Sequence, residues 1–219
     1  MTLENLLKTA LLPIGNTMYI YGGGWNEEDT GAGIEAMTIG VSPKWAEFAI
    51  KQDSSYNFKD YDYKQNKDYI HLGLDCSGYI GWLLYNIFQD KGYVDFSRKI
   101  ANNLATENKG KVKKAKYITE YKAGDIMSGE NISHVWLSLG QCFDGSVVIL
   151  HSSPAGVHIS GTPTPKGIEN SQALKLANKY MSKYYPVWSK KYPVKPFDYL
   201  GKYSQFRWYD NVLYDKYDL

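Results

Sequence analysis

The chain has 219 residues, a formal net charge of +2 and two cysteines, and it is rich in aromatic residues, with 20 Tyr and 6 Trp. This length suits one well-packed domain or two, and so small a net charge gives no global reason to expect nucleic acid as a partner. Two cysteines exclude a disulfide framework, neither lies in a metal-ligand spacing, and no stretch approaches the length of a membrane span. We therefore expect no cofactor, no metal and no membrane-spanning segment.

The segments before the first cysteine predict a helix, a glycine loop and a long excursion. Apolar residues at helical spacing over 3–10 predict a short amphipathic helix. Charged residues interrupt the apolar residues of this segment, and no basic region precedes them, so we do not interpret it as a signal peptide. The glycines of YIYGGGW (19–25) predict a loop where the backbone approaches another segment closely. Residues 25–74 are polar, aromatic and irregular, with one short helix expected around 45–50, and such long excursions are often functional.

A helix is predicted from Cys76 to a far end at Lys91-Gly92, with the cysteine in its first turn. Apolar residues between Ile80 and Phe88 form one buried stripe, and Asp75 suits the N-cap position. Cys76 would then lie where backbone N–H groups and the helix dipole favour an anion, which lowers the pKa of a thiol from about 8.5. The alternative is a small buried apolar residue, because free cysteine is among the most buried residue types.

A strand hairpin is predicted further along the chain. In SHVWLSLG (133–140) apolar and polar residues alternate, which predicts a strand with His134 at its beginning. Asp144-Gly145 predicts a turn, and SVVILH predicts a second strand that ends at His151. The first predicted strand therefore begins with a histidine, and the second ends with one.

The remaining segments complete the expected fold class. The lysine-rich residues 109–116 predict a solvated loop, with contact to an anionic polymer as the minority interpretation. Residues 168–184 predict a helix, and QFRWYDNVL (205–213) predicts a last strand. No internal repeat and no flexible linker divides the sequence. The elements together predict one α+β domain.

Cys76 and His134 supply the two side-chain groups, a thiol and an imidazole, that thiol-based acyl transfer needs. An imidazole takes the thiol proton, and a third polar group, for which His151 is available, fixes the tautomer of that imidazole. A lone histidine is more often structural than catalytic. The spacing of the three residues alone therefore leaves both interpretations open.

Five motifs of the chain resemble, in the same order, those of the NlpC-type cell-wall peptidases. These are papain-like cysteine peptidases that cut the stem peptides of bacterial peptidoglycan. DCSGYIGWLLY is similar to the Asp-Cys-Ser-Gly signature of the family. The other similar motifs are GNTMYIYGG, YKAGDIM, SHVWLSLG and HSSPAGVHI. Five resemblances in one order are far more specific than any single match.

The resemblance implies a fold and a catalytic triad. The implied fold is a papain-like α+β fold, with N-terminal helices packed on a central antiparallel sheet and the nucleophile at a helix N-terminus. In the implied triad Cys76 is the nucleophile, His134 the base and His151 the third polar residue.

The resemblance also implies a substrate-binding group of side chains. Tyr19 matches a tyrosine that points into the site, and Asp75 and Ser77 match positions that line the pocket for the amino end of the substrate. The structural alternatives are core packing for Tyr19, helix capping for Asp75 and a solvated first turn for Ser77. Trp136 stands where the family usually has a small glycine, so it is expected to alter the groove beside His134.

The expected domain organisation is a single NlpC-type domain over residues 1–219. Two parts of it depart from the family pattern. Residues 25–74 form an insertion that is far longer than the usual connection and is expected to overhang or narrow the groove. Residues 161–219 form an aromatic-rich extension, in which packing over the sheet is the favoured role for the rings.

The simple hairpin register conflicts with the implied triad. If Asp144-Gly145 forms a two-residue turn, His151 faces Ser138. Ser138 lies four residues from His134, or about 13 Å at about 3.3 Å per residue, which is too far for a hydrogen bond. We therefore expect a wider loop or a bulge between residues 140 and 146 that shifts the register.

Three further residues are expected to be structural. His158 is the fallback for the third catalytic group, but it lies in a separate alternating stretch. His71 is expected on the surface, where it could border the groove. Cys142 lies at the end of the hairpin with no base near it in the sequence.

The favoured function is that of a cysteine endopeptidase acting on peptidoglycan stem peptides or muropeptide fragments, at the bond between γ-D-glutamate and a diamino acid. The alternatives are a wall-binding module without turnover and a thiol amidase or acyltransferase of the same fold. The resemblance implies a bacterial protein. Without a signal peptide we expect it in the cytoplasm, or in the cell wall or outside the cell if a leader is missing.

Overall fold

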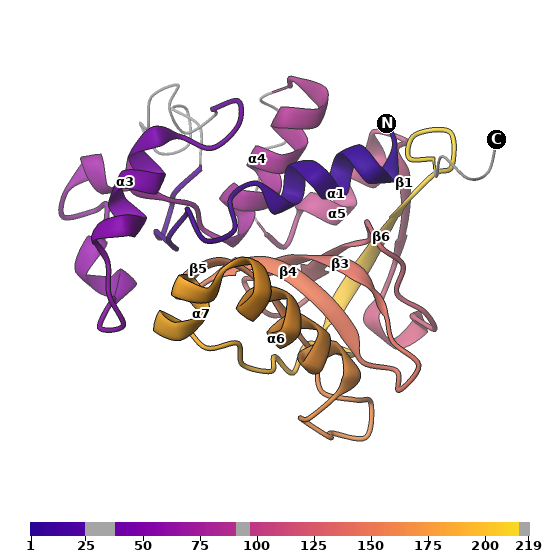
Figure 1. The fold of residues 1–219 in the computed structure, drawn as a ribbon. Coiled ribbons are helices and arrows are strands. Elements are labelled where there is room, and N and C mark those ends of the chain that lie inside the picture. Colours follow the sequence, from indigo (N-terminus) through magenta and orange to yellow (C-terminus); the bar gives the residue numbers. More distant parts are fainter. Residues whose placement is uncertain (25–37, 91–96, 215–219) are drawn as a thin grey trace. The chain divides into compact units, whose positions relative to one another are not determined.

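The structure is a computed structural model, and it describes residues 1–24, 38–90 and 97–214 (Figure 1). The chain divides into two compact units that share the sequence in alternating segments. Unit 1 comprises residues 1–7, 96–150 and 159–219, and unit 2 comprises residues 8–95 and 151–158. Of the predicted triad residues, Cys76 and His151 belong to unit 2 and His134 belongs to unit 1.

A six-stranded antiparallel sheet has the strand order β1-β6-β2-β3-β4-β5. Its strands are β1 (Gly110–Lys113), β2 (Ile126–Gly129), β3 (Val135–Gln141), β4 (Val147–Ser153), β5 (Gly156–Gly161) and β6 (Tyr203–Trp208). Most of the sheet belongs to unit 1, and the end of the β4–β5 hairpin, residues 151–158, belongs to unit 2. The two predicted hairpin strands are confirmed as β3 and β4. Together with the helices, the sheet confirms the α+β class.

The C-terminal part of the chain supplies an inner strand of this sheet. Phe206 in β6 pairs with Val112 in β1 on one side and with Ile126 in β2 on the other. The predicted strand at 205–213 is thus confirmed in its first half. The prediction of a solvated loop at 109–116 is wrong over β1, because the backbone of this lysine-rich segment pairs with β6. The lysine side chains of β1 still point to solvent, since Lys111 and Lys113 are exposed.

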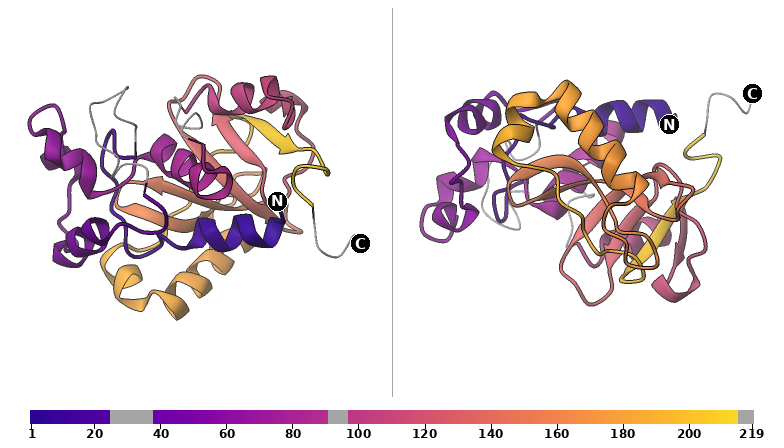
Figure 2. Two further views of the ribbon diagram at one scale, coloured as in Figure 1. Left: turned by 90° about the horizontal axis from the view of Figure 1, so that it is seen from above. Right: turned by 60° about the horizontal axis from the view of Figure 1, so that its bottom comes forward.

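Helices lie on both sides of the part of the sheet that belongs to unit 1. Helix α5 (Ile100–Thr106) packs against β1, β2 and β6, and Figures 1 and 2 show α6 (Gln172–Tyr184) on the opposite side. Helix α6 starts later than predicted because the hydroxyl of Ser171 accepts a hydrogen bond from the backbone N–H of Leu174 and so caps it. The short elements η5 (Ala115–Tyr117) and α7 (Pro186–Lys191) complete the unit.

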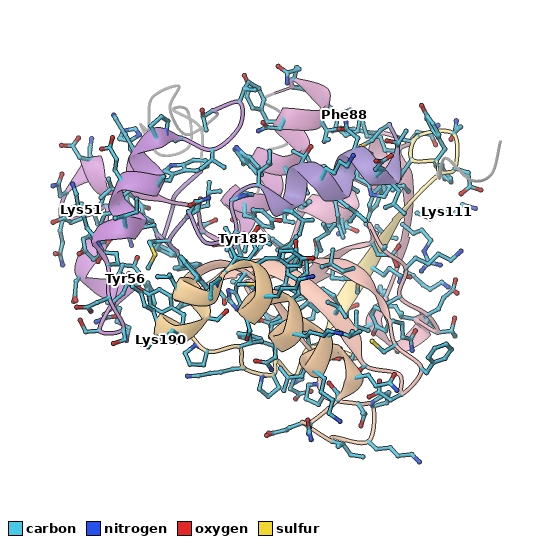
Figure 3. The ribbon with its side chains drawn as sticks, in the orientation of Figure 1. Lys51, Tyr56, Phe88, Lys111, Tyr185 and Lys190 are labelled. Carbon is cyan, nitrogen blue, oxygen red and sulfur yellow. The ribbon has the colours of Figure 1, made fainter. Side chains whose placement is uncertain are left out.

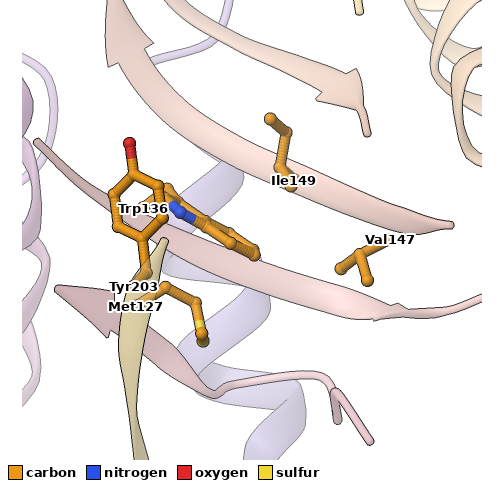
Figure 4. Packing of buried hydrophobic residues seen from close by; sticks show 5 residues of the cluster. All are labelled: Met127, Trp136, Val147, Ile149 and Tyr203. Carbon is orange, nitrogen blue, oxygen red and sulfur yellow. The ribbon is translucent and has the colours of Figure 1, made fainter. Parts of the chain in front are cut away.

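An aromatic cluster forms the core on one face of the unit 1 sheet (Figure 4). Its buried members are Met127, Trp136, Val147, Ile149 and Tyr203. The rings of Trp136 and Tyr203 meet edge to face with 5.8 Å between their centroids, a favourable geometry for aromatic pairs. Partly buried side chains from the C-terminal segment, including Phe197 and Tyr199, pack against the cluster. The packing role predicted for these tail aromatics is what the structure shows.

Further helices within the described residues are α1 (Leu3–Leu11), α3 (Pro43–Lys51), η2 (Phe58–Tyr61), η3 (Lys67–Leu72) and α4 (Cys76–Phe88). The predicted N-terminal helix and the predicted short helix near residue 45 are confirmed as α1 and α3. In the part of the chain that the structure describes, no helix combines the length and the apolar character needed to cross a membrane.

The insertion expected at 25–74 is ordered by its own aromatic residues where the structure describes it, over residues 38–74. The ring of Tyr61 lies 4.8 Å from that of Phe48, 5.6 Å from that of Tyr56 and 5.4 Å from that of Tyr69, measured between centroids. The structure adds two short 3₁₀ elements, η2 and η3, to the one α-helix expected here, and aromatic packing connects them to α3. Residues 25–37 lie outside the described residues.

Candidate functional site

Cys76 is the first residue of α4, as the sequence predicts. Asp75 occupies the N-cap position with extended backbone angles, and its carboxylate accepts a hydrogen bond from the backbone N–H of Gly78. Cys76 is 6% exposed. Both sequence interpretations are therefore partly correct, because Cys76 is buried and also begins a helix. Burial opposes ionisation of a thiol, whereas the helix N-terminus favours it.

The Asp75 carboxylate joins the start of α4 to the glycine loop. Its Oδ1 accepts hydrogen bonds from the N–H of Gly78 at 2.7 Å and from the hydroxyl of Ser77 at 2.9 Å. Its Oδ2 accepts one from the N–H of Gly22 at 3.1 Å. The capping role predicted for Asp75 is confirmed. Ser77 is 4% exposed, so its first turn is not solvated. The binding roles of both residues stay predictions.

The glycine loop approaches α4 so closely that side chains are excluded. A Cβ atom on Gly78 would lie 1.8 Å from the carbonyl oxygen of Gly23, and one on Gly23 would lie 2.2 Å from the carbonyl oxygen of Gly73. The N–H of Asp75 donates to the carbonyl of Gly23 at 3.0 Å. The predicted close approach of backbone at YIYGGGW is thus confirmed, and the segment it approaches is the one that carries Cys76.

In unit 2, residues 17–20 are hydrogen-bonded to two other segments, one on each side. On one side, the N–H of Tyr19 donates to the carbonyl of Ala155 at 3.0 Å. On the other side, the N–H of Leu74 donates to the carbonyl of Met18 at 3.1 Å. The hydroxyl of Ser152 donates to the carbonyl of Leu74 at 2.6 Å. These bonds tie the end of β4, next to His151, to the residues just before Cys76.

Tyr19 is half-buried beside the start of α4. Burial raises the pKa of Tyr19 strongly, and the nearby Asp75 and Cys76 raise it further. The phenol therefore stays protonated at neutral pH and can donate a hydrogen bond to an oxyanion. The insertion supports this residue in two ways. The ring of Phe58 meets that of Tyr19 edge to face at 5.2 Å, and the hydroxyl of Tyr56, a residue labelled in Figure 3, donates to the backbone carbonyl of Tyr19.

His151 is fully buried and lies against His158. Their Nε2 atoms are 3.3 Å apart, and Nδ1 of His158 lies 2.8 Å from the carbonyl oxygen of Gly156. Burial lowers the pKa of His158, although the Gly156 carbonyl raises it. The sequence analysis missed this pair. A two-residue turn at Pro154-Ala155 would have predicted it, because the two histidines stand at equal distances from that turn.

His134 and Trp136 belong to unit 1. The ring of His134, which precedes β3, lies 5.3 Å from that of Tyr199 between centroids, and its backbone carbonyl accepts a hydrogen bond from Gly129 at 2.9 Å. Trp136 is fully buried in the unit 1 core. The predicted roles of His134 as base and of Trp136 as a groove residue stay predictions, as does the pairing of His134 with Cys76.

The β3–β4 hairpin has a different register from the simple one. The turn closes through a hydrogen bond from the N–H of Cys142 to the carbonyl of Ser146, one residue wider than the two-residue turn. A bulge between Ser138 and Gly140 shifts the pairing once more, so that Ser138 faces Ile149 instead of His151. The expected wider loop is confirmed, while the bulge lies just before the range predicted for it. Both shifts act in the direction that the predicted triad requires.

The remaining candidates have structural surroundings. Burial raises the pKa of Cys142, and Asp144 raises it further, while the hydroxyl of Ser146 lowers it. This thiol is therefore a poor nucleophile at neutral pH. His71, expected on the surface, is half-buried in η3. Among the described residues, no three His, Cys, Asp or Glu side chains are grouped so that they could hold a metal ion.

Comparison with known proteins does not add a family. No protein-family model, no curated protein and no solved structure matches the chain. The resemblance to the NlpC-type peptidases therefore depends on the five sequence motifs.

Proposed function

We propose that the protein is a papain-like cysteine endopeptidase of the NlpC type that hydrolyses peptidoglycan stem peptides. The proposed bond lies between D-glutamate, through its γ-carboxyl, and a diamino acid. Cys76 is the proposed nucleophile, His134 the base and His151 the residue that orients it. The assignment of the two histidines comes from their motifs.

One observation supports the proposal most: Cys76 begins α4 with a protonated phenol beside it. The Tyr19 phenol and the first-turn backbone are hydrogen-bond donors of the kind that stabilise an oxyanion. A thiol at this position has what a nucleophile needs, namely a helix N-terminus that favours the thiolate. The Asp75 carboxylate and the glycine loop hold the turn in place through the hydrogen bonds at 2.7–3.1 Å.

The proposed reaction has two steps. In the first, the Cys76 thiolate attacks the amide carbon, the oxyanion forms near the Tyr19 phenol, and the leaving amine takes the proton that His134 had removed from the thiol. The products of this step are a thioester on Cys76 and a peptide that begins with the diamino acid. In the second step, water gives a proton to His134 while its oxygen attacks the thioester carbon. The C–S bond breaks, the acyl peptide leaves as a carboxylic acid that ends in γ-D-glutamate, and His134 returns the proton to the sulfur of Cys76.

The test is product analysis with purified muropeptides. The full-length protein should release two fragments whose masses correspond to cleavage after γ-D-glutamate. Cys76→Ala should abolish release, while Cys142→Ala should leave it unchanged, since that thiol lies outside the proposed site. Absence of cleavage by the unchanged protein would overturn the proposal. Products in which an added amine replaces water would instead identify an acyltransferase with the same nucleophile.

A further inference from the structure

The contact between His151 and His158 defines where the protons of both rings lie. A carbonyl oxygen only accepts hydrogen bonds, so Nδ1 of His158, at 2.8 Å from the carbonyl of Gly156, carries a proton and donates it. In a neutral ring Nε2 of His158 then has no proton and is an acceptor. The neutral form is favoured here, because burial lowers the pKa of His158.

The tautomer of His151 follows from that of His158. The two Nε2 atoms are 3.3 Å apart, and a hydrogen bond between them needs one proton. Since His158 offers a lone pair at Nε2, the proton belongs to Nε2 of His151. A neutral His151 then has a lone pair at Nδ1, which makes that atom a hydrogen-bond acceptor.

We propose that His158 is a positioning residue that holds His151 in the tautomer protonated at Nε2, with Nδ1 as an acceptor. An acceptor is what the third residue of a triad must offer to the N–H of the catalytic imidazole. This inference rests on the proposed function for its catalytic meaning. The chain of hydrogen bonds runs from the Gly156 carbonyl through His158 to His151, so residues of β4 and β5 determine the position of one proton.

The geometry favours a positioning role over a direct one. Nδ1 of His158 is occupied by the carbonyl of its own strand, and Nε2 faces His151. Both nitrogens of His158 are therefore engaged within the β4–β5 hairpin. Because His151 is fully buried, its ring is less able to exchange one tautomer for another through water. The partner at Nε2 accordingly decides the tautomer.

The test measures the tautomer directly, by long-range ¹⁵N–¹H correlation spectra of the ¹⁵N-histidine-labelled full-length protein. A protonated and an unprotonated ring nitrogen resonate far apart. The chain has four histidines, so single substitutions to Gln assign each signal. The unchanged protein should show His151 protonated at Nε2 and His158 protonated at Nδ1. A His151 protonated at Nδ1, or at both nitrogens, at neutral pH would overturn the inference.

Two variants separate positioning from packing. His158→Gln keeps an acceptor oxygen near the position of Nε2 and should keep the His151 tautomer. His158→Phe fills the space without an acceptor and should produce a mixture of tautomers, while His71→Phe, elsewhere in unit 2, should not. A His158→Phe spectrum with an unchanged His151 would count against the inference. If His158→Phe does not fold, the spectra of the unchanged protein and of His158→Gln still decide the question.

Peptidase activity gives a second readout. His158→Phe should lower kcat by about tenfold, the order of effect expected for one lost hydrogen bond, with KM unchanged, and His158→Gln should restore most of it. Equal kcat values for His158→Phe and the unchanged protein would overturn the catalytic meaning of the inference. If the unchanged protein cleaves no muropeptide, the proposed function fails, whereas the tautomer spectra still test the proton assignment.

Discussion

The carbonyl oxygen of Gly23 lies 1.8 Å from the point where a Cβ atom on Gly78 would stand. The backbone of the glycine loop therefore contacts the first turn of α4 with no room for a methyl group. Since both partners are backbone, neither can rotate away as a side chain would. This contact sets the position of Cys76 relative to Tyr19, because the loop and the Tyr19 segment are continuous.

We predict that Gly78→Ala destabilises the protein and removes the reactivity of Cys76. Relieving the overlap must displace the loop or the helix, and overpacking of this kind costs about 1–3 kcal/mol of unfolding free energy. Urea denaturation measures the change. Gly201→Ala is the control: its backbone disfavours a side chain, with φ 73°, but no atom lies within 4 Å of the added Cβ. It should cost about 1 kcal/mol and leave Cys76 reactive. Equal effects of the two substitutions would contradict this interpretation.

Tyr19→Phe should lower kcat by about a hundredfold and leave the unfolding free energy nearly unchanged. The substitution removes a proposed oxyanion donor, for which losses of about 100-fold to 1000-fold are typical, but it keeps the ring that packs against Phe58. Steady-state kinetics and thermal unfolding measure the two effects. A large loss of stability with normal kcat would make Tyr19 a core residue, the structural alternative.

The ionisation of Tyr19 can be tested separately. Its raised pKa means that the phenol keeps its proton as the pH rises past about 10, where an ordinary tyrosine loses it. The tyrosinate absorbance of the unchanged protein minus that of Tyr19→Phe should therefore show no ionisation step up to about pH 11. A step near pH 10 would mean that the phenol is exposed to water.

Local sequence signals predicted the start of α4 well. Asp75 caps the helix and apolar spacing continues it, and both signals lie within a few residues of each other. The start of α6 was misplaced because the capping residue, Ser171, was not identified. The hairpin strands were predicted for the same local reason, since alternation is a property of neighbouring residues. The signals that predict these elements therefore lie within short stretches of the chain.

Non-local contacts explain what the sequence analysis missed. β1 is a strand because Val112 and its neighbours pair with β6, which lies about ninety residues further along the chain. The bulge at residues 138–140 has no sequence signal beyond one glycine with φ 113°. The aromatic core around Tyr61 depends on rings from three separate helices. In each case the partner, not the segment itself, decides the structure.

The two thiols should differ in their rate of alkylation. Because burial raises the pKa of Cys142, its thiolate fraction at a given pH is lower than that of an ordinary cysteine, and its labelling should lag. Cys76, at a helix N-terminus, should react with iodoacetamide well below pH 8. Peptide mass spectrometry over a pH series measures both rates. Cys142→Ser should keep the fast phase and Cys76→Ser should remove it; two equal, ordinary titrations would refute the nucleophile assignment.

Asp75→Asn should weaken the connection between α4 and the glycine loop. An asparagine oxygen can still accept from the N–H of Gly78, but the amide nitrogen cannot accept from the N–H of Gly22. That buried donor is left without its carboxylate partner, which costs about 1–3 kcal/mol. Urea denaturation should show this loss. An unfolding free energy equal to that of the unchanged protein would mean that the bond between Gly22 and Asp75 contributes little.

The Asp75 carboxylate also leads to a prediction about substrate specificity. If Asp75 also faces the amino end of the substrate, its carboxylate attracts the ammonium of a free stem peptide, whereas an amine capped by muramic acid offers it no positive charge. Loss of an ion pair that is shielded from water costs several kcal/mol, enough for a preference of about a hundredfold. We therefore expect much faster cleavage of free tri- and tetrapeptides that begin with L-alanine than of capped ones. Competition between the two substrates, with products quantified by mass, measures the ratio.

Two variants show whether the charge of Asp75 is the cause of that preference. Asp75→Asn should bring the ratio of the two cleavage rates, free peptide over capped peptide, close to one. The assay is run under conditions in which the variant is fully folded. Ser77→Ala is the matched control, because it removes the hydroxyl that donates to Asp75 at 2.9 Å but keeps the carboxylate. It should keep the preference for the free amine. If the unchanged protein cleaves capped and free peptides equally, Asp75 acts only as a helix cap, and the groove accepts intact wall.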